Sequence, residues 1–554
     1  MPERGILDRN LLALSARHPE LARALSSARA HPNLTFLESR QGPPVPALSR
    51  SGRPFPMHSR FDPSAEGRRL ADSAREGFLV AFGLGGAYHL TPLLEKRTMT
   101  GLLIVEKDIS LLRGILENID MARLFADSRI LLVMDPSPEG LSRIILDRYL
   151  PVLYGNLGSL SLRSRLDAEP EWFAERADAL RGLPESLGRD YTVQTRFGRR
   201  WFVHTVANLP TSERIGTVLP PSGRFLVTAA GPSLHEQLPR IRRLHDGGAT
   251  LLATDTSLPF LAAEGVAPDI VLSIDCQAVS YHHFLKGLPK RTLLFLDLAS
   301  PPALTRITDR ILFFSSGHPF SLYLNRLYRP FPILDLSGGN VTHAAVSLAR
   351  AAGAGEIFLF GADFSYPGGL PYAKGTYLYP HFQSRSTRTS GSEHAFWKFI
   401  SSSRPRRETA DSGWRFRTSS MDHYRESLEK AAEAMDARII QDPGGGVPLS
   451  LAAGGAGGSP PPRDKFATML SAGPAAMGWK DFLDDYALRL LSLPPLNGPP
   501  QDYLAGLSVE SQQAWATLLP SAATFRESAE DGPAAVEEAR QWTMDRIRTM
   551  RSRH

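Results

Sequence analysis

The chain has little cysteine and no long apolar run. Its one cysteine, Cys276, stands among 554 residues, which excludes an intrachain disulfide and a cysteine-based metal cluster and favours a reducing compartment. The first thirty residues scatter charges where a signal peptide needs an unbroken apolar stretch. The longest apolar stretches, such as 292–304, are interrupted by Asp and Pro, short of the roughly 18 residues of a membrane helix. We therefore expect a cytoplasmic protein without a membrane span.

The chain also lacks a strong charge of either sign. Lys and Arg number 63 against 57 Asp and Glu, a net charge of +6, which is too weak a bias to predict nucleic-acid binding. Hydrophobic residues make up 42% and charged residues 22%, as in ordinary globular proteins, so wholesale disorder and a coiled coil are excluded. At about 150 residues per domain, the length predicts three to four folded units.

Short apolar segments alternate with helical stretches, which is typical of parallel α/β sheets. We expect a Rossmann-like N-terminal domain, a doubly wound central domain and an α-helical C-terminal region. The expected central strands are 224–229, 250–254, 269–274, 292–296, 311–314 and 356–360. The expected ranges are 1–76 for a helical and Pro/Arg-rich lead-in, 77–217 for the N-terminal domain with a helical connector, 218–445 for the central domain, 446–463 for a flexible Gly/Pro linker and 464–554 for the helical C-terminal domain.

Carboxylates follow four of the central strands. These residues are Asp255, Asp275, Asp297 and Asp363. Because ligands of an open parallel sheet bind beyond the carboxyl ends of its strands, we expect the four side chains along one rim. Each alone is commonly a helix cap. Together they suggest a site for hydroxyls, a metal or a basic group, with a general base among them.

Two glycine-containing turns open helices in the central domain. The first, Gly231-Pro232-Ser233, has Glu236 three residues after the serine, a capping-box pattern, and the start of that helix would suit a phosphate. The alternative is that Ser233 only caps the helix.

The second turn is Gly338-Gly339-Asn340, where the glycines allow close approach of a ligand and Asn340 offers both a donor and an acceptor. A plain tight turn is the competing interpretation. His343, one turn into the helix, is either a packed core histidine or an acid–base group.

A stretch of about 27 residues follows Asp363, and loops of that length in compact domains are usually lids or disordered. In it, Lys374, Tyr377 and Arg385 are candidates to close over an anionic ligand.

In the N-terminal domain, Gly83 to Gly86 follow a strand and Glu106 stands about 20 residues later, which resembles a dinucleotide or S-adenosylmethionine fingerprint. Tyr88 replaces its third glycine, so whether the turn binds a ligand stays open.

The ordered motifs of the central domain resemble a known family. The runs 231–234, 254–256, 268–275, 338–341 and 357–363 look like the MptE-like domain of the motility accessory factor (Maf) proteins, in the same order and at similar spacing. Residues 190–192, Trp201 and 208–209 resemble the segment before that domain, and 82–85 with 105–106 resemble the Maf N-terminal domain. The resemblance covers about residues 77–445.

This resemblance implies a flagellin glycosyltransferase with a sialyltransferase-like central domain. Such an enzyme moves a nonulosonic acid of the pseudaminic or legionaminic type from its CMP-activated form to Ser or Thr of flagellin. It implies that Gly231, Pro232, Ser233, Gly338, Gly339 and Asn340 hold the nucleotide and its phosphate. It also implies that Asp255, Asp275 and Asp363 line the sugar and acceptor side, with a carboxylate or His343 as base and Lys374 near the departing phosphate. A divalent metal is left open.

The sequence departs from the family pattern in the lid and after the last strand. Tyr372 stands where the family commonly has His, and Ala362 where it commonly has Gln. Two alternatives remain: a 6-hydroxymethyl-dihydropterin diphosphokinase that uses ATP and Mg²⁺, and a non-catalytic flagellin-binding factor.

Overall fold

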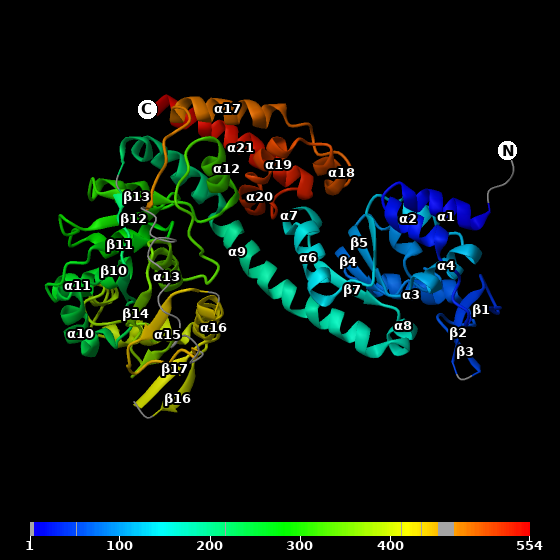
Figure 1. The fold of residues 1–554 in the computed structure, drawn as a ribbon, viewed down its shortest axis with the longest axis horizontal. Coiled ribbons are helices and arrows are strands. Elements are labelled where there is room, and N and C mark those ends of the chain that lie inside the picture. The colour runs from blue at the N-terminus through cyan, green and yellow to red at the C-terminus, as the bar shows by residue number, and fades with distance from the viewer. Residues whose placement is uncertain are drawn as a thin grey trace. The chain divides into compact units, whose positions relative to one another are not determined.

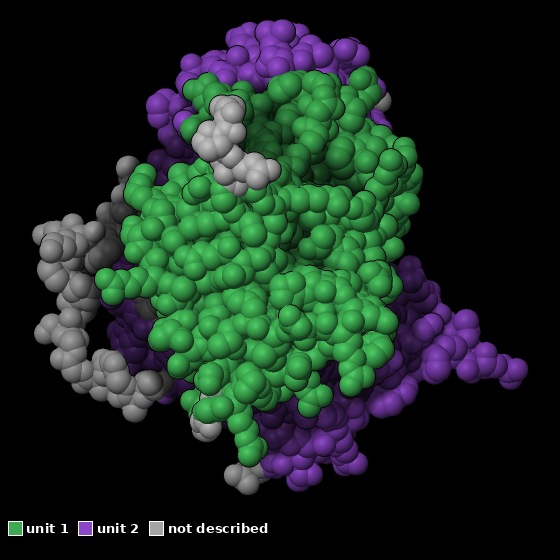
Figure 2. Space-filling model, turned by 90° about the vertical axis from the view of Figure 1, so that its right-hand side faces the viewer, with its two compact units in different colours: residues 1–198, 493–512, 518–541 green, residues 199–492, 513–517, 542–554 purple. Residues whose placement is uncertain are grey.

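The structure is a computed structural model that describes residues 5–50, 52–216, 218–410, 413–433, 435–451 and 470–553. The chain forms two compact units, coloured separately in Figure 2. The first unit comprises 1–198, 493–512 and 518–541, and the second comprises 199–492, 513–517 and 542–554. The units therefore divide the chain differently from the expected ranges, because the C-terminal helical region contributes to both.

The second unit is built on a seven-stranded parallel sheet (Figure 1). Its sheet order is β13 (Ile311–Phe314), β12 (Leu293–Asp297), β11 (Ile270–Ser273), β10 (Thr250–Thr254), β9 (Arg224–Thr228), β14 (Glu356–Phe360) and β18 (Arg438–Gln441). The chain runs outward from β9 to β13 and then returns to add β14 on the other side of β9. The α/β prediction is confirmed, and the strand order reverses between β9 and β14.

Helices cover both faces of this sheet, which explains why its strands read as continuous apolar runs. Helix α10 (Leu234–Asp246) packs on β9 and β14, with the guanidinium of Arg240 5.8 Å from the ring centre of Phe358. Helix α13 (Val341–Ala351) packs through buried Ala and Val side chains on β9, β10 and β11. The other helical segments between the strands are η2 (Asp255–Ser257), α11 (Leu258–Ala263), η3 (Ala278–Phe284), η4 (Pro302–Arg306) and α12 (Pro319–Leu327).

A folded insertion separates β14 from β18. It contains β15 (Tyr366–Pro367), α14 (Leu378–Gln383), α15 (Ser392–Ser401), β16 (Arg406–Ala410), β17 (Gly413–Arg417) and α16 (Ser419–Glu433). The three strands form an antiparallel sheet in the order β15, β17, β16. The expected 27-residue loop is thus wrong as a description, because it includes β15 and α14.

The first unit contains a smaller parallel sheet in the order β6 (Ile130–Met134), β5 (Met99–Glu106), β4 (Gly77–Phe82) and β7 (Leu157–Ser161). Before it come α1 (Ile6–Ser15), α2 (Pro19–Ser27), an antiparallel sheet of β1 (Leu34–Leu37), β2 (Val45–Arg50) and β3 (Arg53–Pro56), and α3 (Pro63–Ser73). The remaining elements of this part are η1 (Thr91–Glu95), α4 (Ile109–Asn118), α5 (Ala122–Ala126), α6 (Pro138–Arg148), α7 (Pro151–Tyr154) and α8 (Arg163–Ala168). The predicted lead-in, 1–76, therefore forms three β-strands as well as helices.

The 45-residue helix α9 (Pro170–Arg214) begins in the first unit and ends in the second. The short strands β8 (Val218–Leu219) and β19 (Leu470–Ser471) pair with each other. The C-terminal helices are α17 (Trp479–Ser492), α18 (Pro500–Ala505), α19 (Val509–Ala516), α20 (Leu519–Phe525) and α21 (Gly532–Arg553). No helix in the described ranges combines the length and the apolar character that crossing a bilayer requires.

Candidate functional site

The four predicted carboxylates follow strands of the same parallel sheet. Asp255 begins the turn after β10, Asp275 follows β11, Asp297 ends β12 and Asp363 follows β14. All four therefore lie at the carboxyl edge of the sheet, as expected. Their surroundings differ: Asp255 and Asp275 form one group, Asp363 belongs to a second, and the buried Asp297 accepts the N–H of Ala299.

Asp255 and Asp275 form the first group, on neighbouring strands. The buried Asp255 accepts hydrogen bonds from Ser273 Oγ at 2.6 Å and from the backbone N–H of Thr256 at 2.7 Å. The half-buried Asp275 accepts the N–H of Gln277 at 2.8 Å. Burial raises the pKa of Asp275, and the nearby negative charge of Asp255 raises it further. A carboxyl group with a raised pKa is better matched to proton abstraction near neutral pH.

Two aromatic side chains lie beside this pair. The ring of His283, from η3, is perpendicular to the ring of Tyr377 with 4.6 Å between the centroids. His283 is 7% exposed, and within the described structure its buried Nδ1 has no hydrogen-bond partner. Burial raises the pKa of Tyr377, and the charges of Asp255 and Asp275 add to the increase. Tyr377 was a predicted lid residue, whereas no motif in the sequence pointed to His283.

Asp363 belongs to a second group, at the reversal between β9 and β14. Its Oδ2 accepts the backbone N–H of Ser233 at 3.0 Å, and burial raises its pKa. The predicted capping box is wrong, because Ser233 makes no side-chain hydrogen bond to its helix and its Oγ instead accepts the N–H of Gly445 at 3.0 Å. In the turn that was expected to hold a phosphate, the Ser233 N–H thus donates to a carboxylate.

The glycine segment after β18 packs onto Asp363. A Cβ atom added at Gly446 would lie 2.4 Å from the Asp363 Cα, and one added at Gly231 would lie 2.3 Å from its Oδ2. The N–H of Val447 donates to the Asp363 carbonyl at 2.8 Å. The first residues of the expected linker therefore lie against the domain, while most of that linker, 452–463, is outside the described residues.

The second glycine turn is built around the start of α13. Asn340 accepts the N–H of His343 at 3.0 Å and donates to the Gly338 carbonyl at 3.1 Å, so its amide caps the helix. Gly339 has a φ of +68°, a conformation that glycine adopts easily. His343 is 1% exposed, with its Nε2 3.4 Å from an Asp335 oxygen. The geometry gives both Asn340 and His343 structural contacts in this turn.

The segment expected to be a lid is attached to the sheet. The N–H of Ala373 donates to the Ala230 carbonyl at 2.8 Å, directly after β9. Burial raises the pKa of Tyr372, the residue that replaces the family histidine. Lys374 and Arg385 are exposed, so of the three predicted lid side chains only Tyr377 packs beside the carboxylate pair.

The glycine turn of the first unit is filled by the protein's own side chains. Glu106 is 2% exposed, accepts the N–H of Leu84 at 3.0 Å and forms a buried ion pair with Arg165. A Cβ atom added at Gly83 would lie 2.7 Å from the Cβ of Arg165. The carboxylate that a dinucleotide fingerprint reserves for ribose hydroxyls is therefore already bound.

Among the residues with described positions, no group of three or more His, Cys, Asp or Glu side chains is arranged to hold a metal ion.

Comparison with known proteins places this site in a family domain. Residues 203–369 match the family model described as 6-hydroxymethylpterin diphosphokinase MptE-like. An uncharacterized protein of Treponema pallidum (strain Nichols) is 30% identical over 192 residues, 34% of this chain and 68% of that protein. A second uncharacterized protein of the same organism is 26% identical over 166 residues, 29% of this chain and 79% of the relative.

A solved structure extends the similarity to the whole chain. It is that of the Maf glycosyltransferase from Magnetospirillum magneticum AMB-1, with a TM-score of 0.58 and 15% sequence identity. The match covers 98% of this chain and 95% of the other. At this identity the match establishes a shared fold, which includes the elements on both sides of the MptE-like domain.

Proposed function

Because this chain belongs to one family with the Treponema pallidum protein, carries an MptE-like domain and has the Maf fold, we propose that it is a glycosyltransferase. It transfers a nonulosonic acid of the pseudaminic or legionaminic type from a CMP-sugar to Ser or Thr of flagellin in the cytoplasm. The observation that carries the proposal is the fold match over 98% of the chain, because a domain-only relationship would leave the flanking elements unmatched.

In this reaction the acceptor hydroxyl oxygen bonds to the anomeric carbon, the bond from that carbon to the phosphate oxygen breaks, and CMP leaves. The hydroxyl proton must go to a base. We assign that role to Asp275, because burial and the charge of Asp255 raise its pKa. His283 and Tyr377 pack beside the pair, and the buried Nδ1 of His283 has no hydrogen-bond partner in the described structure.

The nucleotide is expected at the reversal between β9 and β14. Gly231 and Ser233 line one side of this edge, and the Gly338 to Asn340 turn opens α13 at the same edge of the sheet. The exposed ammonium group of Lys374 has no ion pair in the described structure, so it is free to approach the departing phosphate. Asp363 holds the loop backbone at Ser233 rather than the sugar.

The family model also favours a second function, a diphosphokinase that passes pyrophosphate from ATP to a pterin alcohol. Such a reaction needs Mg²⁺, and Asp255 and Asp275 offer carboxylate oxygens of the kind that this ion prefers. The model covers residues 203–369 only, whereas the fold match covers both flanks. A non-catalytic flagellin-binding factor is the remaining alternative.

The test uses the purified full chain with a CMP-nonulosonic acid and unglycosylated flagellin, and measures the intact mass of flagellin and the release of CMP. Asp275→Asn is expected to lower transfer by about 100-fold or more, because it removes the base. Asp309→Asn, an exposed carboxylate of the same unit, is the matched control and is expected to transfer normally.

Transfer at a near-normal rate by a folded Asp275→Asn chain would show that another group is the base. Turnover of ATP and a pterin alcohol, with no transfer from the CMP-sugar, would identify the diphosphokinase. Flagellin binding without either activity would identify the carrier. In cells, deletion of the gene is expected to remove nonulosonic-acid-sized increments from the intact mass of flagellin.

A further inference from the structure

The hairpin of β16 and β17 has two faces of opposite character. Its register places Arg407 opposite Phe416, Glu408 opposite Arg415 and Thr409 opposite Trp414. Since side chains alternate between the faces of a strand, Arg407, Thr409, Trp414 and Phe416 share one face, and Arg406, Glu408, Arg415 and Arg417 share the other.

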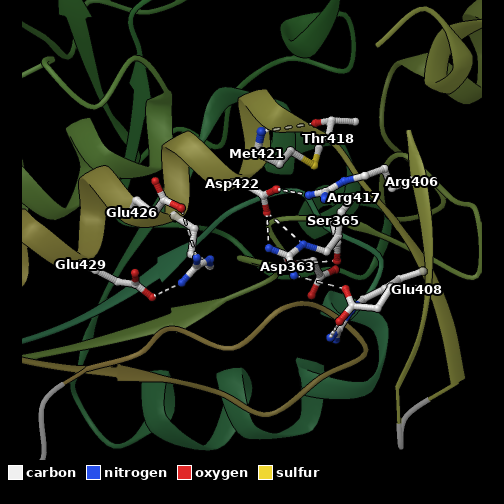
Figure 3. Close-up of polar contacts among 12 residues, drawn as sticks. Asp363, Ser365, Arg406, Glu408, Arg417, Thr418, Met421, Asp422, Glu426 and Glu429 are labelled. Carbon is white, nitrogen blue, oxygen red and sulfur yellow. Dashed lines mark hydrogen bonds and ion pairs between the residues drawn. The ribbon is translucent and has the colours of Figure 1, made fainter. Parts of the chain in front are cut away.

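The polar face is an ion-pair network, drawn in Figure 3 with the neighbouring Asp363 and Ser365. Arg417 pairs with Asp422 of α16 at 2.6 Å and with Glu408 at 3.4 Å, and Arg415 pairs with Glu408 at 3.3 Å. Both acidic side chains of this network, Glu408 and Asp422, are paired with arginines. Those acids are therefore not available to a partner on the opposite face.

The same network connects the hairpin to the candidate site. Arg415 donates to the carbonyl of Gly446 at 2.6 Å, and Gly446 is the glycine that packs onto Asp363. Ser365, just before β15, donates its hydroxyl to the Asp363 carbonyl at 2.9 Å. The position of the hairpin is thus fixed relative to the carboxyl edge of the sheet.

The opposite face presents aromatic rings to solvent. Trp414 is 38% exposed and lies 5.3 Å from Phe416, and Trp397 of α15 is 51% exposed and lies 5.6 Å from the same ring. The guanidinium of Arg407 lies 5.0 Å from the centre of the Trp414 ring. We call Trp397, Arg407, Trp414 and Phe416 the aromatic-basic face.

The exposed charges around this face are mostly basic. Among the described residues 392–410 outside the ion-pair network, the exposed charged side chains are Lys398, Arg404 and Arg407, which are basic, and Glu393, which is acidic. Tryptophan and arginine are among the residue types that contribute most to the binding energy of protein interfaces. Solvent-exposed tryptophans cost free energy in a monomer, and a partner that covers them recovers it.

We propose that the aromatic-basic face docks the protein acceptor, through an acidic surface of that protein with an apolar centre. The inference rests on the proposed function, and it adds how the acceptor is recognised. Charge complementarity selects an acidic partner, and the connection through Arg415 and Gly446 keeps a docked acceptor close to the reacting edge of the sheet.

The test compares the full chain with a Trp397→Ala/Trp414→Ala variant and an Arg407→Glu variant. The probe is unglycosylated flagellin, and its affinity is measured by titration calorimetry at low and high salt. Both variants are expected to bind flagellin at least about tenfold more weakly, because they remove hot-spot contacts. The Arg407→Glu effect is expected to shrink at high salt, where charge attraction is screened.

Matched controls are Leu488→Ala/Leu491→Ala, exposed apolar residues of α17, and Arg181→Glu, an exposed arginine of α9. Both are expected to bind flagellin normally. The Trp397→Ala/Trp414→Ala and Arg407→Glu variants are also expected to raise the KM for flagellin. Their release of CMP from the donor in the absence of flagellin is expected to be unchanged.

Unchanged flagellin affinity in both hairpin variants would overturn the proposal. So would a hairpin-dependent affinity for phosphatidylglycerol vesicles without one for flagellin, which would identify a membrane-binding face. A chain that releases no CMP yet binds flagellin through the hairpin would refute the glycosyltransferase while leaving the docking surface in place.

Discussion

Asp297 is a carboxyl group whose charged form is disfavoured by burial. It ends β12, is 3% exposed and accepts the N–H of Ala299 at 2.8 Å. Burial raises its pKa from 3.8 to about 6, against the opposing effect of hydrogen bonds from Ala299 and Ser316. The folded chain therefore holds the Asp297 proton more tightly than the unfolded chain does.

The pKa difference predicts how stability changes with pH. As pH rises from about 4 to about 6, the unfolded chain releases the Asp297 proton while the folded chain keeps it, so the free energy of unfolding falls. A difference of about 2 pKa units corresponds to roughly 3 kcal/mol at neutral pH. Asp297→Asn keeps the shape and cannot ionise. We expect it to stabilise the second unit by up to about 3 kcal/mol at pH 7.5, and by less than about 1 kcal/mol at pH 4.

Urea titrations at pH 4, 6 and 7.5 measure this effect, with the reaction of Cys276 with dithiodipyridine as the reporter, because this disulfide reagent reacts with thiols at acidic as well as neutral pH. Cys276 is the chain's one cysteine and is 5% exposed, so its labelling reports the unfolding of the second unit. Asp309→Asn, an exposed carboxylate, is the control. A stability difference between Asp297→Asn and the parent chain that does not grow between pH 4 and 7.5 would refute the reasoning.

Three further changes test other contacts. Asn340→Ala is expected to cost about 1 kcal/mol in the same urea titrations, because α13 loses its cap, whereas Asn340→Asp retains most of it. Arg165→Met is expected to cost about 3–5 kcal/mol in thermal unfolding of the first unit, because it leaves the buried charge of Glu106 unpaired. Glu106→Gln is expected to cost less, because Arg165 keeps its ion pair with Glu169, and the double variant less than the sum of the two. Gly231→Ala is expected to cost about 1–3 kcal/mol, because its Cβ would lie 2.3 Å from Asp363 Oδ2 and 2.5 Å from the Gly361 carbonyl oxygen. In a double-mutant cycle, Asp363→Ala should relieve only part of that cost, because the Gly361 contact stays.

The strands of the large sheet were predictable because burial on both faces makes them apolar throughout. The ranges 250–254, 311–314 and 356–360 agree with the structure at both ends. The hairpin of β16 and β17 was not predictable in the same way, because RRETA and GWRFR are rich in arginine and contain no continuous apolar run. Strand β18 begins with arginine and is four residues long, so it carries too little pattern to be recognised.

The place of the site in the fold could be predicted from the sequence, but most of the contacts within it could not. Topology alone placed Asp255, Asp275 and Asp363 at one edge, since residues after parallel strands converge there. The pairing of Ser233 with Asp363 joins positions 130 residues apart, and the local spacing to Glu236 pointed to a different contact. His283 has no motif around it, and only the folded chain places its ring against Tyr377.

The discontinuous first unit has a consequence for biosynthesis. Residues 1–198 of this unit leave the ribosome first, but their partners in 493–512 and 518–541 begin to follow about 294 residues later, or roughly 15–60 s at 5–20 residues per second. Until then, Arg17 lacks the carboxylate of Asp502, with which it makes hydrogen bonds of 2.7 and 2.9 Å, and the Thr195 carbonyl lacks the hydroxyl of Thr524. The nascent N-terminal segment therefore lacks these contacts while the MptE-like domain is synthesised. During this interval it has the greatest need of a chaperone.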